Sequence, residues 1–382
     1  MSSTNGSGND AESNASDATI TVHEGADDSW KTESNVSNVG WTSERNVSVP
    51  NTVEHSVLAS SIHIQPPLEK GVHECEWFSN AASYVKNACN DNMDYEALIL
   101  PNNSLMGSLA GEVGLLTAIK TVDLSNNKIA STLSSKVQYL TLLQFLHLNG
   151  NVLSGPLPSE LGKLERLSTL QLDRNKLTST IPSKLGFLHG NLNWLYLSDN
   201  LLTGSLPKQL GALTELRGLW ANRNGGGLTG IIPEGFNKLT LLEALSIAEN
   251  ILSGTLPSFI FNNLTKLEWL QFNGNIFSGS LPTEVGELDR LTFLDVEFNM
   301  LSTTSTSNTI PTQMGLLADL QMLLLGYNEF SGSVPSELLQ LKNLTDLSLA
   351  GNAQLERAIS EGTCNLLRDG SLLYFTFHQD IC

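Results

Sequence analysis

Leucines recur at fixed spacing between residues 98 and 352, and each set is followed by an asparagine. The clearest unit consists of Leu143, Leu146, Leu148, Asn151, Leu153, Gly155, Leu157 and Pro158. Units repeat every 24 to 29 residues when they are aligned on the asparagines, which are Asn103, Asn127, Asn151, Asn175, Asn200, Asn224, Asn250, Asn275, Asn299, Asn328 and Asn352. So many units in register exclude a chance pattern.

Each unit predicts one short strand followed by a turn. The two leucines that flank His147 lie two residues apart, so on an extended segment both face inward while His147 faces outward. Asn151 turns the chain, and its amide is expected to bond with the backbone of the neighbouring coil and form a ladder. Gly155 permits a tight bend, and Pro158 ends the strand because it fixes φ and lacks an N–H.

A leucine-rich period of 20 to 29 residues is the signature of a leucine-rich-repeat solenoid. One coil cannot bury its own leucines, so stability comes from stacking neighbours, and the two ends need caps. The predicted fold class is α/β: a curved right-handed superhelix of about 11 repeats of 24 residues, with a parallel concave sheet.

The phrase Leu-x-Gly-x-Ile/Leu-Pro-x-x-Leu-Gly-x-Leu occurs at 153–164 and 202–213, with close relatives at 252–264 and 277–288. It resembles the plant-type subclass of leucine-rich repeats, which includes receptor-kinase ectodomains and polygalacturonase-inhibitor-like proteins. The resemblance covers about two thirds of the chain, and no kinase motif accompanies it. Three stretches depart from it: 128–137 lacks the Gly-x-Ile-Pro element, Asn224 precedes inserted glycines, and 300–311 is longer.

Composition divides the chain into four parts. Residues 1–65 are rich in Ser, Asn, Thr, Asp and Gly, and this composition predicts a disordered acidic tail. Its Trp30 and Trp41 are docking motifs or, more simply, scattered linker aromatics. Residues 66–95 form a cysteine-containing cap, in which Trp77 covers the first coil. Residues 96–352 hold the repeats, and 353–382 form the C-terminal cap.

The four cysteines flank the repeats, since Cys75 and Cys89 precede them and Cys364 and Cys382 follow them. Eleven strands at about 4.8 Å separate the two ends by about 50 Å. Bridged Cα atoms lie within about 7 Å. Disulfides are therefore expected within each cap, which indicates an oxidising compartment. The alternative is four reduced thiols in an intracellular protein.

The compartment stays open on sequence grounds. Residues 1–10 are polar and lack the features of a signal peptide, so export by another signal, an incomplete start and an intracellular location all remain. No apolar run is long enough to span a bilayer. We expect an extracellular or cell-surface location, with a cytoplasmic one as the alternative. Glycosylation sequons occur at Asn5, Asn14, Asn35, Asn46, Asn102, Asn263 and Asn343.

Recognition is expected on the concave face, where the outward positions vary while the leucine scaffold does not. The candidate ligand-binding residues are Phe145, His147, Trp194, Tyr196, Arg217, Trp220, Arg223, Trp269, Phe293, Asp295, Glu297, Phe298 and Tyr327. Exposed aromatics beside Arg and carboxylates are typical of binding surfaces. The structural alternative is that these aromatics only stack as cross-strand pairs.

Other chemistries are disfavoured. The net charge of −18 opposes nucleic-acid and anionic-membrane partners. Asp295 and Glu297 are spaced about 7 Å apart, as in inverting glycosidases, but an open sheet is expected to provide no pocket that raises the pKa of one carboxylate. The histidines and cysteines have no metal-ligand spacing, and no cofactor is implied.

The sequence therefore predicts a non-enzymatic module that binds a protein or a glycan. An intracellular scaffold is one alternative. An ice-binding or surface-binding solenoid is another, and it needs a flat row of repeated Thr or Asn, which the irregular concave positions lack. The Ser/Thr insertion 302–308 is either a contact loop or a tolerated surface insertion.

Overall fold

The computed structural model describes residues 96–109, 114, 116–302, 310–356, 362 and 372–377. The predicted tail at 1–65, the predicted cap at 66–95, all four cysteines and most of the 302–308 insertion lie outside these residues.

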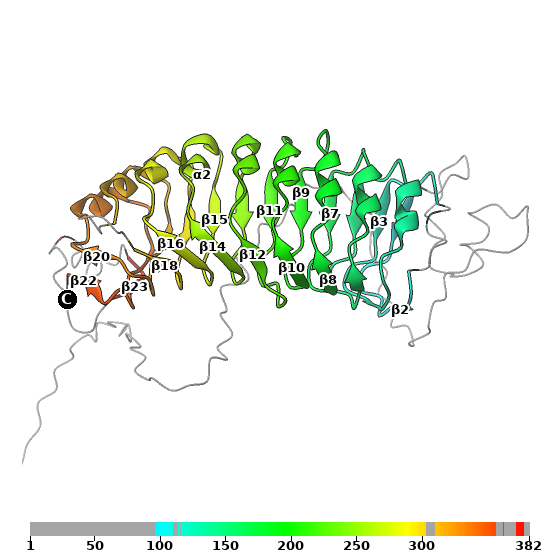
Figure 1. Ribbon diagram of the computed structural model, residues 1–382, viewed down its shortest axis with the longest axis horizontal. Helices are drawn as coiled ribbons and strands as arrows, with labels where there is room; N and C mark the ends of the chain where they lie inside the picture. Colours follow the sequence, from blue (N-terminus) through cyan, green and yellow to red (C-terminus); the bar gives the residue numbers. More distant parts are fainter. Residues whose placement is uncertain are drawn as a thin grey trace, which may run out of the picture. The chain divides into compact units, whose positions relative to one another are not determined.

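One side of the solenoid is a parallel sheet in which every coil adds one strand beside the last (Figure 1). In the described residues it has twelve strands: β1 (Ala97–Ile99), β3 (Thr121–Asp123), β5 (Phe145–His147), β7 (Thr169–Gln171), β9 (Trp194–Tyr196), β11 (Gly218–Trp220), β13 (Ala244–Ser246), β15 (Trp269–Gln271), β17 (Phe293–Asp295), β19 (Met322–Leu324), β21 (Asp346–Ser348) and β23 (Tyr374–Thr376). We call its outward side the long-sheet face. The predicted solenoid with a parallel concave sheet is confirmed.

A second parallel sheet follows the asparagine turn of each coil and runs beside the first (Figure 1). Its seven strands are β6 (Ser154–Pro156), β8 (Lys176–Thr180), β10 (Leu201–Ser205), β12 (Leu228–Gly230), β14 (Ile251–Thr255), β16 (Ile276–Gly279) and β18 (Met300–Leu301). Two short pairs extend this side, β2 (Met106–Gly107) with β4 (Lys128–Ile129) and β20 (Ser331–Gly332) with β22 (Gln354–Leu355).

Short helices close the third side of each coil. They are η2 (Ser135–Tyr139), η3 (Ser159–Lys163), η4 (Ser183–Phe187), η5 (Lys208–Ala212), η6 (Glu234–Lys238), α2 (Ser258–Asn263), η7 (Thr283–Glu287), η8 (Thr312–Leu316) and η9 (Ser336–Gln340). A proline precedes each of them except η2, because its fixed φ starts a helix without losing a hydrogen bond. At η2, in the coil that lacks the Pro element, the Ser134 hydroxyl accepts the N–H of Lys136 at 3.2 Å.

The asparagine ladder is confirmed and joins the two sheets. Asn200 donates from Nδ2 to the carbonyl oxygens of Leu172 at 3.0 Å and Leu197 at 3.2 Å, and its Oδ1 accepts the N–H of Leu177 at 3.0 Å. Asn200 therefore satisfies backbone groups of its own coil and of the preceding one. The same pattern recurs at Asn127, Asn151, Asn175, Asn224, Asn250, Asn275, Asn299, Asn328 and Asn352.

The core is a continuous column of leucine with a phenylalanine layer. Leu146, Leu170 and Leu195 lie side by side at the centres of paired strands and are almost fully buried. Phe236, Phe261 and Phe272 are fully buried in the coils that follow. This core fixes each strand, so the side chains on either side of its central leucine face outward. No helix among the described residues is long and apolar enough to cross a membrane.

Candidate functional site

The solenoid places the predicted binding residues on one side of the molecule. Most flank the central buried residue of a long-sheet strand, as Trp194 and Tyr196 flank Leu195. Others lie at the strand entry, as Arg217 does, or at the turn that follows the strand, as Arg223, Phe298 and Tyr327 do. They form a band from β5 to the turn after β19 because neighbouring strands pair in order, although none of them lies on β7 or β13.

The first aromatic cluster contains Trp194, Tyr196 and Trp220. The Trp220 ring is stacked on Tyr196, with centroids 4.4 Å apart and planes 6° apart, and its centroid lies 5.8 Å from that of Trp194. A Cβ atom on Gly218 would lie 2.1 Å from the Trp220 ring. Glycine at 218 therefore allows Trp220 to lie flat across its own strand. All three rings keep part of their surface exposed.

The second aromatic cluster contains Trp269 and Phe293, stacked at 3.7 Å with planes 2° apart. Trp269 keeps partial exposure, whereas Phe293 is only 3% exposed. The expectation that Phe293 is exposed is therefore wrong, because Trp269 covers it. A third pair, Phe298 and Tyr327, is stacked with ring centroids 4.3 Å apart, and each residue is more than 40% exposed. Cross-strand stacking, the structural alternative, thus occurs at all three clusters.

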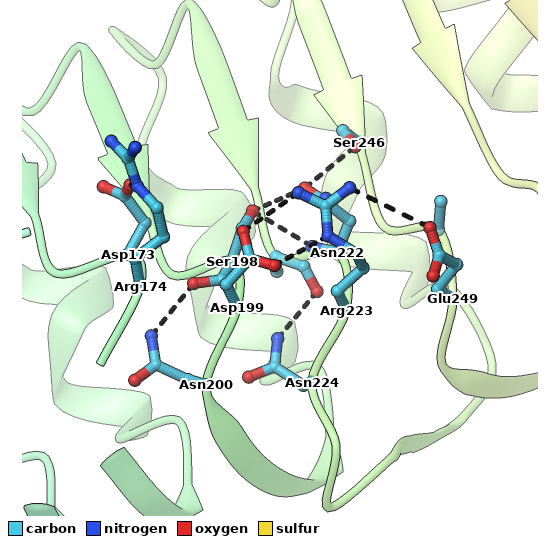
Figure 2. Close-up of polar contacts among 12 residues, drawn as sticks. Asp173, Arg174, Ser198, Asp199, Asn200, Asn222, Arg223, Asn224, Ser246 and Glu249 are labelled. Carbon is cyan, nitrogen blue, oxygen red and sulfur yellow. Dashed lines mark hydrogen bonds and ion pairs between the residues drawn. The ribbon is translucent and has the colours of Figure 1, made fainter. Parts of the chain in front are cut away.

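A row of charged side chains follows the end of the long-sheet strands (Figure 2). Arg223 lies between Asp199 and Glu249, with Nε 2.6 Å from Oδ1 and Nη2 3.0 Å from Oδ2 of Asp199, and Nη1 3.9 Å from Oε1 of Glu249. The hydrogen bonds to Asp199 raise the pKa of Arg223. Arg217 and Glu243 form a second ion pair at the opposite end of the strands. These pairs are partly exposed, so they contribute little to stability but fix the position of the charges.

The charged row has an unusual backbone. The residue before each ladder asparagine has positive φ, between 50° and 58° where it is not glycine. Glycine or asparagine adopts this conformation readily, but larger side chains do so rarely. Here it is adopted by Asn102, Asn126, Arg174, Asp199, Arg223, Glu249, Phe298 and Tyr327. The tight turn required by the ladder therefore directs large side chains to the edge of the long sheet.

Asp295 contradicts the expectation that an open sheet provides no site that raises the pKa of a carboxylate. It is 6% exposed, and burial raises its pKa to about 8, despite a hydrogen bond of 3.0 Å that Oδ1 accepts from the N–H of Glu297. The negative charges of Glu297 and Glu249 add to the rise. The neighbours of Asp295 in the sheet register are Gln271 on β15 and Leu324 on β19. Asp295 is therefore protonated at neutral pH.

This burial also removes the glycosidase-like arrangement. Such chemistry needs two carboxyl groups that reach the substrate. The carboxyl of Asp295 is covered, and Glu297 is hydrogen-bonded by the hydroxyl of Ser348 two coils further on. Thr376 on β23 donates to Ser348 at 2.9 Å. The sequence did not indicate this polar chain, because its members are far apart in the sequence and meet only through strand register.

His147 lies in a second polar cluster. Burial lowers its pKa, although the charges of Asp123 and Asp173 oppose the change. Its Nδ1 is 4.0 Å from Oδ2 of Asp123, while its Nε2 and the Oδ1 of Asn149 are buried without a hydrogen-bond partner. The Phe145 ring meets the imidazole edge-on, with the two ring centroids 6.2 Å apart. Within the described ranges, no group of three His, Cys, Asp or Glu side chains is arranged to hold a metal ion.

Comparisons with known proteins agree with this architecture. The Leucine Rich Repeat family model matches residues 142–164 and 191–213. Receptor-like protein 41 of Arabidopsis thaliana is 30% identical over 126 residues. A solved plant peptide hormone receptor, RGFR1 in complex with RGF2, is 32% identical with a TM-score of 0.63. The chain carries plant-type leucine-rich repeats. The resemblance inferred from the repeat phrase is thereby confirmed.

This leucine-rich-repeat chain spans only part of its relatives. The match to receptor-like protein 41 covers 33% of this chain and 14% of the relative. The match to RGFR1 covers 66% of this chain and 39% of that one. The Arabidopsis receptor kinase HAESA ectodomain, solved with an IDA peptide hormone ligand, is 34% identical with a TM-score of 0.62. That match covers 66% of this chain and 42% of the HAESA chain.

A plant ice-binding protein is a further similar structure, with 28% identity and a TM-score of 0.57, and the match covers 65% of this chain and 77% of that one. The same solenoid thus occurs in proteins with different ligands, and the fold alone does not select among them.

Proposed function

We propose that this chain is a non-catalytic recognition module that binds an extended segment of a protein or peptide across the long-sheet face. The observation that carries the proposal is the band of partly exposed aromatic rings beside fixed charges. Trp220, Trp269 and Tyr327 belong to three separate clusters on that band, so a ligand that lies across the strands contacts several of them. Rigid aromatic side chains provide large contact area at a small loss of conformational entropy.

Two further points support a peptide partner. RGFR1 and HAESA were solved with RGF2 and an IDA peptide hormone, and their repeat regions are among the structures similar to this chain. In addition, Arg217 and Arg223 lie at opposite ends of their strand, each beside a carboxylate. A ligand with a backbone and charged groups finds donors and acceptors on both edges of the aromatic band.

The location that fits this proposal is the cell exterior or cell surface. Of the glycosylation sequons, Asn102, Asn263 and Asn343 fall on described residues, and all three are exposed. Protein isolated from its native source should lose mass on treatment with an N-glycosidase. An unchanged mass, together with four reduced thiols, would favour the cytoplasmic alternative.

The test uses a random linear peptide library displayed on phage and selected on the immobilised chain. The wild-type chain should enrich a set of related peptides. The triple variant Trp194→Ala, Trp220→Ala, Trp269→Ala should lose this enrichment by at least about tenfold, because the contact surface is removed. Circular dichroism and the melting temperature establish that the triple variant is folded.

A matched control removes aromatic rings from the opposite side. Tyr139 and Phe187 lie on the short helices and are 54% and 62% exposed. The double variant Tyr139→Ala, Phe187→Ala should enrich the same peptides as the wild type. Retained enrichment in the folded triple variant would reject the long-sheet face as the binding site. Binding to a glycan array without any peptide enrichment would reject the peptide partner.

A further inference from the structure

The outward side of the second sheet, here called the second-sheet face, differs from the rest of the surface in charge. Among the strands from β6 to β18, Lys176 is the one charged residue. Three rows of outward side chains cross these strands. The middle row consists of Ser154, Thr178, Thr203, Thr229, Ser253 and Ser278, and the row beyond it of Pro156, Thr180, Ser205, Ile231, Thr255 and Ser280.

The fold itself explains the β-branched residues of the outer row. A Cβ atom on Gly204 would lie 2.8 Å from Cγ2 of Thr180, and one on Gly254 would lie 2.8 Å from Cγ2 of Ile231. The methyl group of one coil therefore packs on the glycine of the next. Packing between coils accounts for these threonines without any ligand, so they are no argument for ice binding.

In the row nearest the ladder asparagines, Ile251 packs in this way on Gly227, where an added Cβ atom would lie 2.4 Å from its Cδ1. Packing on a glycine does not account for the exposure of the row as a whole. Leu201, Ile251, Ile276 and Met300 occupy it in the central coils, and each is 41% to 50% exposed. The core beneath is already filled by the next residue of each strand, as Leu202 and Leu252 are fully buried. A row of exposed aliphatic side chains on a chain that is otherwise so acidic indicates a contact surface.

The two ends of this row are charged with opposite signs. Lys176 occupies the position one coil before Leu201, and Glu329 the position one coil after Met300. Both side chains are exposed, and neither forms a salt bridge within the described part of the chain. Over seven successive coils the row is therefore Lys176, Leu201, Gly227, Ile251, Ile276, Met300 and Glu329.

This order is self-complementary about Ile251, the fourth of the seven positions. A two-fold axis through Ile251 brings Lys176 of one copy beside Glu329 of the other, and Leu201 beside Met300. Ile276 faces Gly227, on which Ile251 of its own chain packs. Residue i contacts residue j and j contacts i, as a symmetric dimer interface requires.

We propose that a second copy of this chain docks antiparallel on the second-sheet face, with its aliphatic row against the same row and Lys176 paired with Glu329. The proposal is independent of the peptide-binding function, because it uses the opposite side of the asparagine turn. The sequon asparagines that the structure describes, Asn102, Asn263 and Asn343, are exposed, and none of them lies on the strands of this face.

The area sets the expected strength. Seven strands at about 4.8 Å give a contact about 30 Å long. Three rows of side chains make it about 15 Å wide, so each copy buries about 450 Å². This is below the roughly 800 Å² per partner of a standard interface. The dimer should therefore be weak, with a dissociation constant of roughly tens of micromolar.

Sedimentation velocity of the full chain from about 5 to about 200 µM tests the proposal. The wild-type chain should shift from monomer to dimer across this range. Ile251→Asp places two carboxylates at the axis and should leave a monomer throughout. Lys176→Glu and Glu329→Lys should each raise the dissociation constant by about tenfold at low salt. The double charge swap should restore dimerisation, because the pair is rebuilt with reversed sign.

Leu316→Asp is the matched control, since Leu316 is 61% exposed on η8 and away from this face. This variant should dimerise as the wild type does, and so should the triple tryptophan variant. A wild-type chain that stays monomeric, an Ile251→Asp variant that dimerises, or a double swap that fails to recover would overturn the proposal. Thermal hysteresis of a monomeric wild-type chain, lost in Ile251→Asp, would instead assign the face to ice.

Discussion

The long-sheet face and the second-sheet face are built from the same coils, yet they differ in how their side chains are determined. Across the long-sheet face the outward residue changes from coil to coil, and neighbours combine as stacked rings, ion pairs or a buried acid. Across the second-sheet face the same small residues return in each coil, and strands β6 to β18 hold one charge.

The difference has a packing cause. On the second-sheet face, a methyl group of one coil contacts the glycine of the next, so both positions are restricted in size. On the long-sheet face, the core contacts end at the central leucine, and the outward side chains are limited only by each other. Side-chain variety is therefore possible on one face and restricted on the other, which is consistent with our proposal that recognition uses the long-sheet face.

Removing the asparagine that joins the two faces should have the largest effect. Asn200→Ala leaves the buried N–H of Leu177 without its acceptor. It also removes one of two amide donors to the carbonyl oxygens of Leu172 and Leu197, which keep the bonds from Asn175 and Asn224. The unsatisfied N–H costs about 1–3 kcal/mol and each of the two lost carbonyl bonds about 0.5–1.5 kcal/mol, so the free energy of unfolding should fall by roughly 2–6 kcal/mol. Urea titration followed by circular dichroism measures it.

The exposed Asn262 on α2 serves as the control for that variant. Asn262→Ala should change stability by less than about 0.5 kcal/mol. Equal effects of the two substitutions would mean that the ladder contributes nothing beyond ordinary surface contacts.

An effect confined to the long-sheet face is expected from Asp295→Asn. The pKa of Asp295 is about 8 in the folded chain, against 3.8 for an unperturbed aspartate. Between these values the folded state binds more protons than the unfolded state, so the stability of the wild-type chain falls as pH rises. The neutral variant lacks this loss. It should equal the wild type below pH 4 and exceed it increasingly up to pH 8, by at most about 1.4 kcal/mol per pH unit.

Thermal unfolding of both chains from pH 4 to pH 8 measures this difference. Asp319 lies on the helical side and is exposed, so Asp319→Asn should give no comparable gain at any of these pH values. A constant gap between Asp295→Asn and wild type across the whole range would exclude titration of Asp295 as the cause.

A smaller effect, confined to the second-sheet side, is expected from Gly204→Ala. Gly204 has φ of +75°, and the added Cβ would lie 2.8 Å from Cγ2 of Thr180. Strain and contact together should cost about 1–2 kcal/mol in the free energy of unfolding. In a Thr180→Ser background, which lacks that methyl group, the contact part of the cost should disappear.

Gly190 provides the comparison within the same chain, because an added Cβ there meets no atom within 4 Å. Gly190→Ala should leave the urea midpoint unchanged or slightly raised. If Gly204→Ala were as harmless as Gly190→Ala, the packing explanation for the repeated second-sheet face would be wrong.

The sequence predicted the fold well because the determining contacts are local and periodic. The leucine spacing gave strands centred on residues such as Leu146, and the aligned asparagines gave the ladder. The repeat phrase also placed the tryptophans on the long sheet. The candidate site was only partly predictable: the list of outward residues followed from alternation, but the burial of Phe293 and Asp295 did not.

Those two residues were missed because exposure depends on the coils before and after. Trp269 covers Phe293 from a position 24 residues away, and the surroundings of Asp295 come from β15 and the turn beyond its own strand. A pattern within one repeat holds no information on the size of the side chain in the next repeat. The exposed aliphatic row from Leu201 to Met300 was missed for a related reason, since its members begin strands of successive coils and form a row only when the coils are stacked.

The sequence by itself determined the coil: its strand, its turn, its leucine core and the stacking of one coil on another. Each of these depends on residues within one period, where chain geometry fixes distances. Only the tertiary structure decided which outward groups are covered, which charges pair and which pKa is raised, because these depend on side chains that approach across coils. Burial and electrostatics act through space, so they appear only once the coils are stacked.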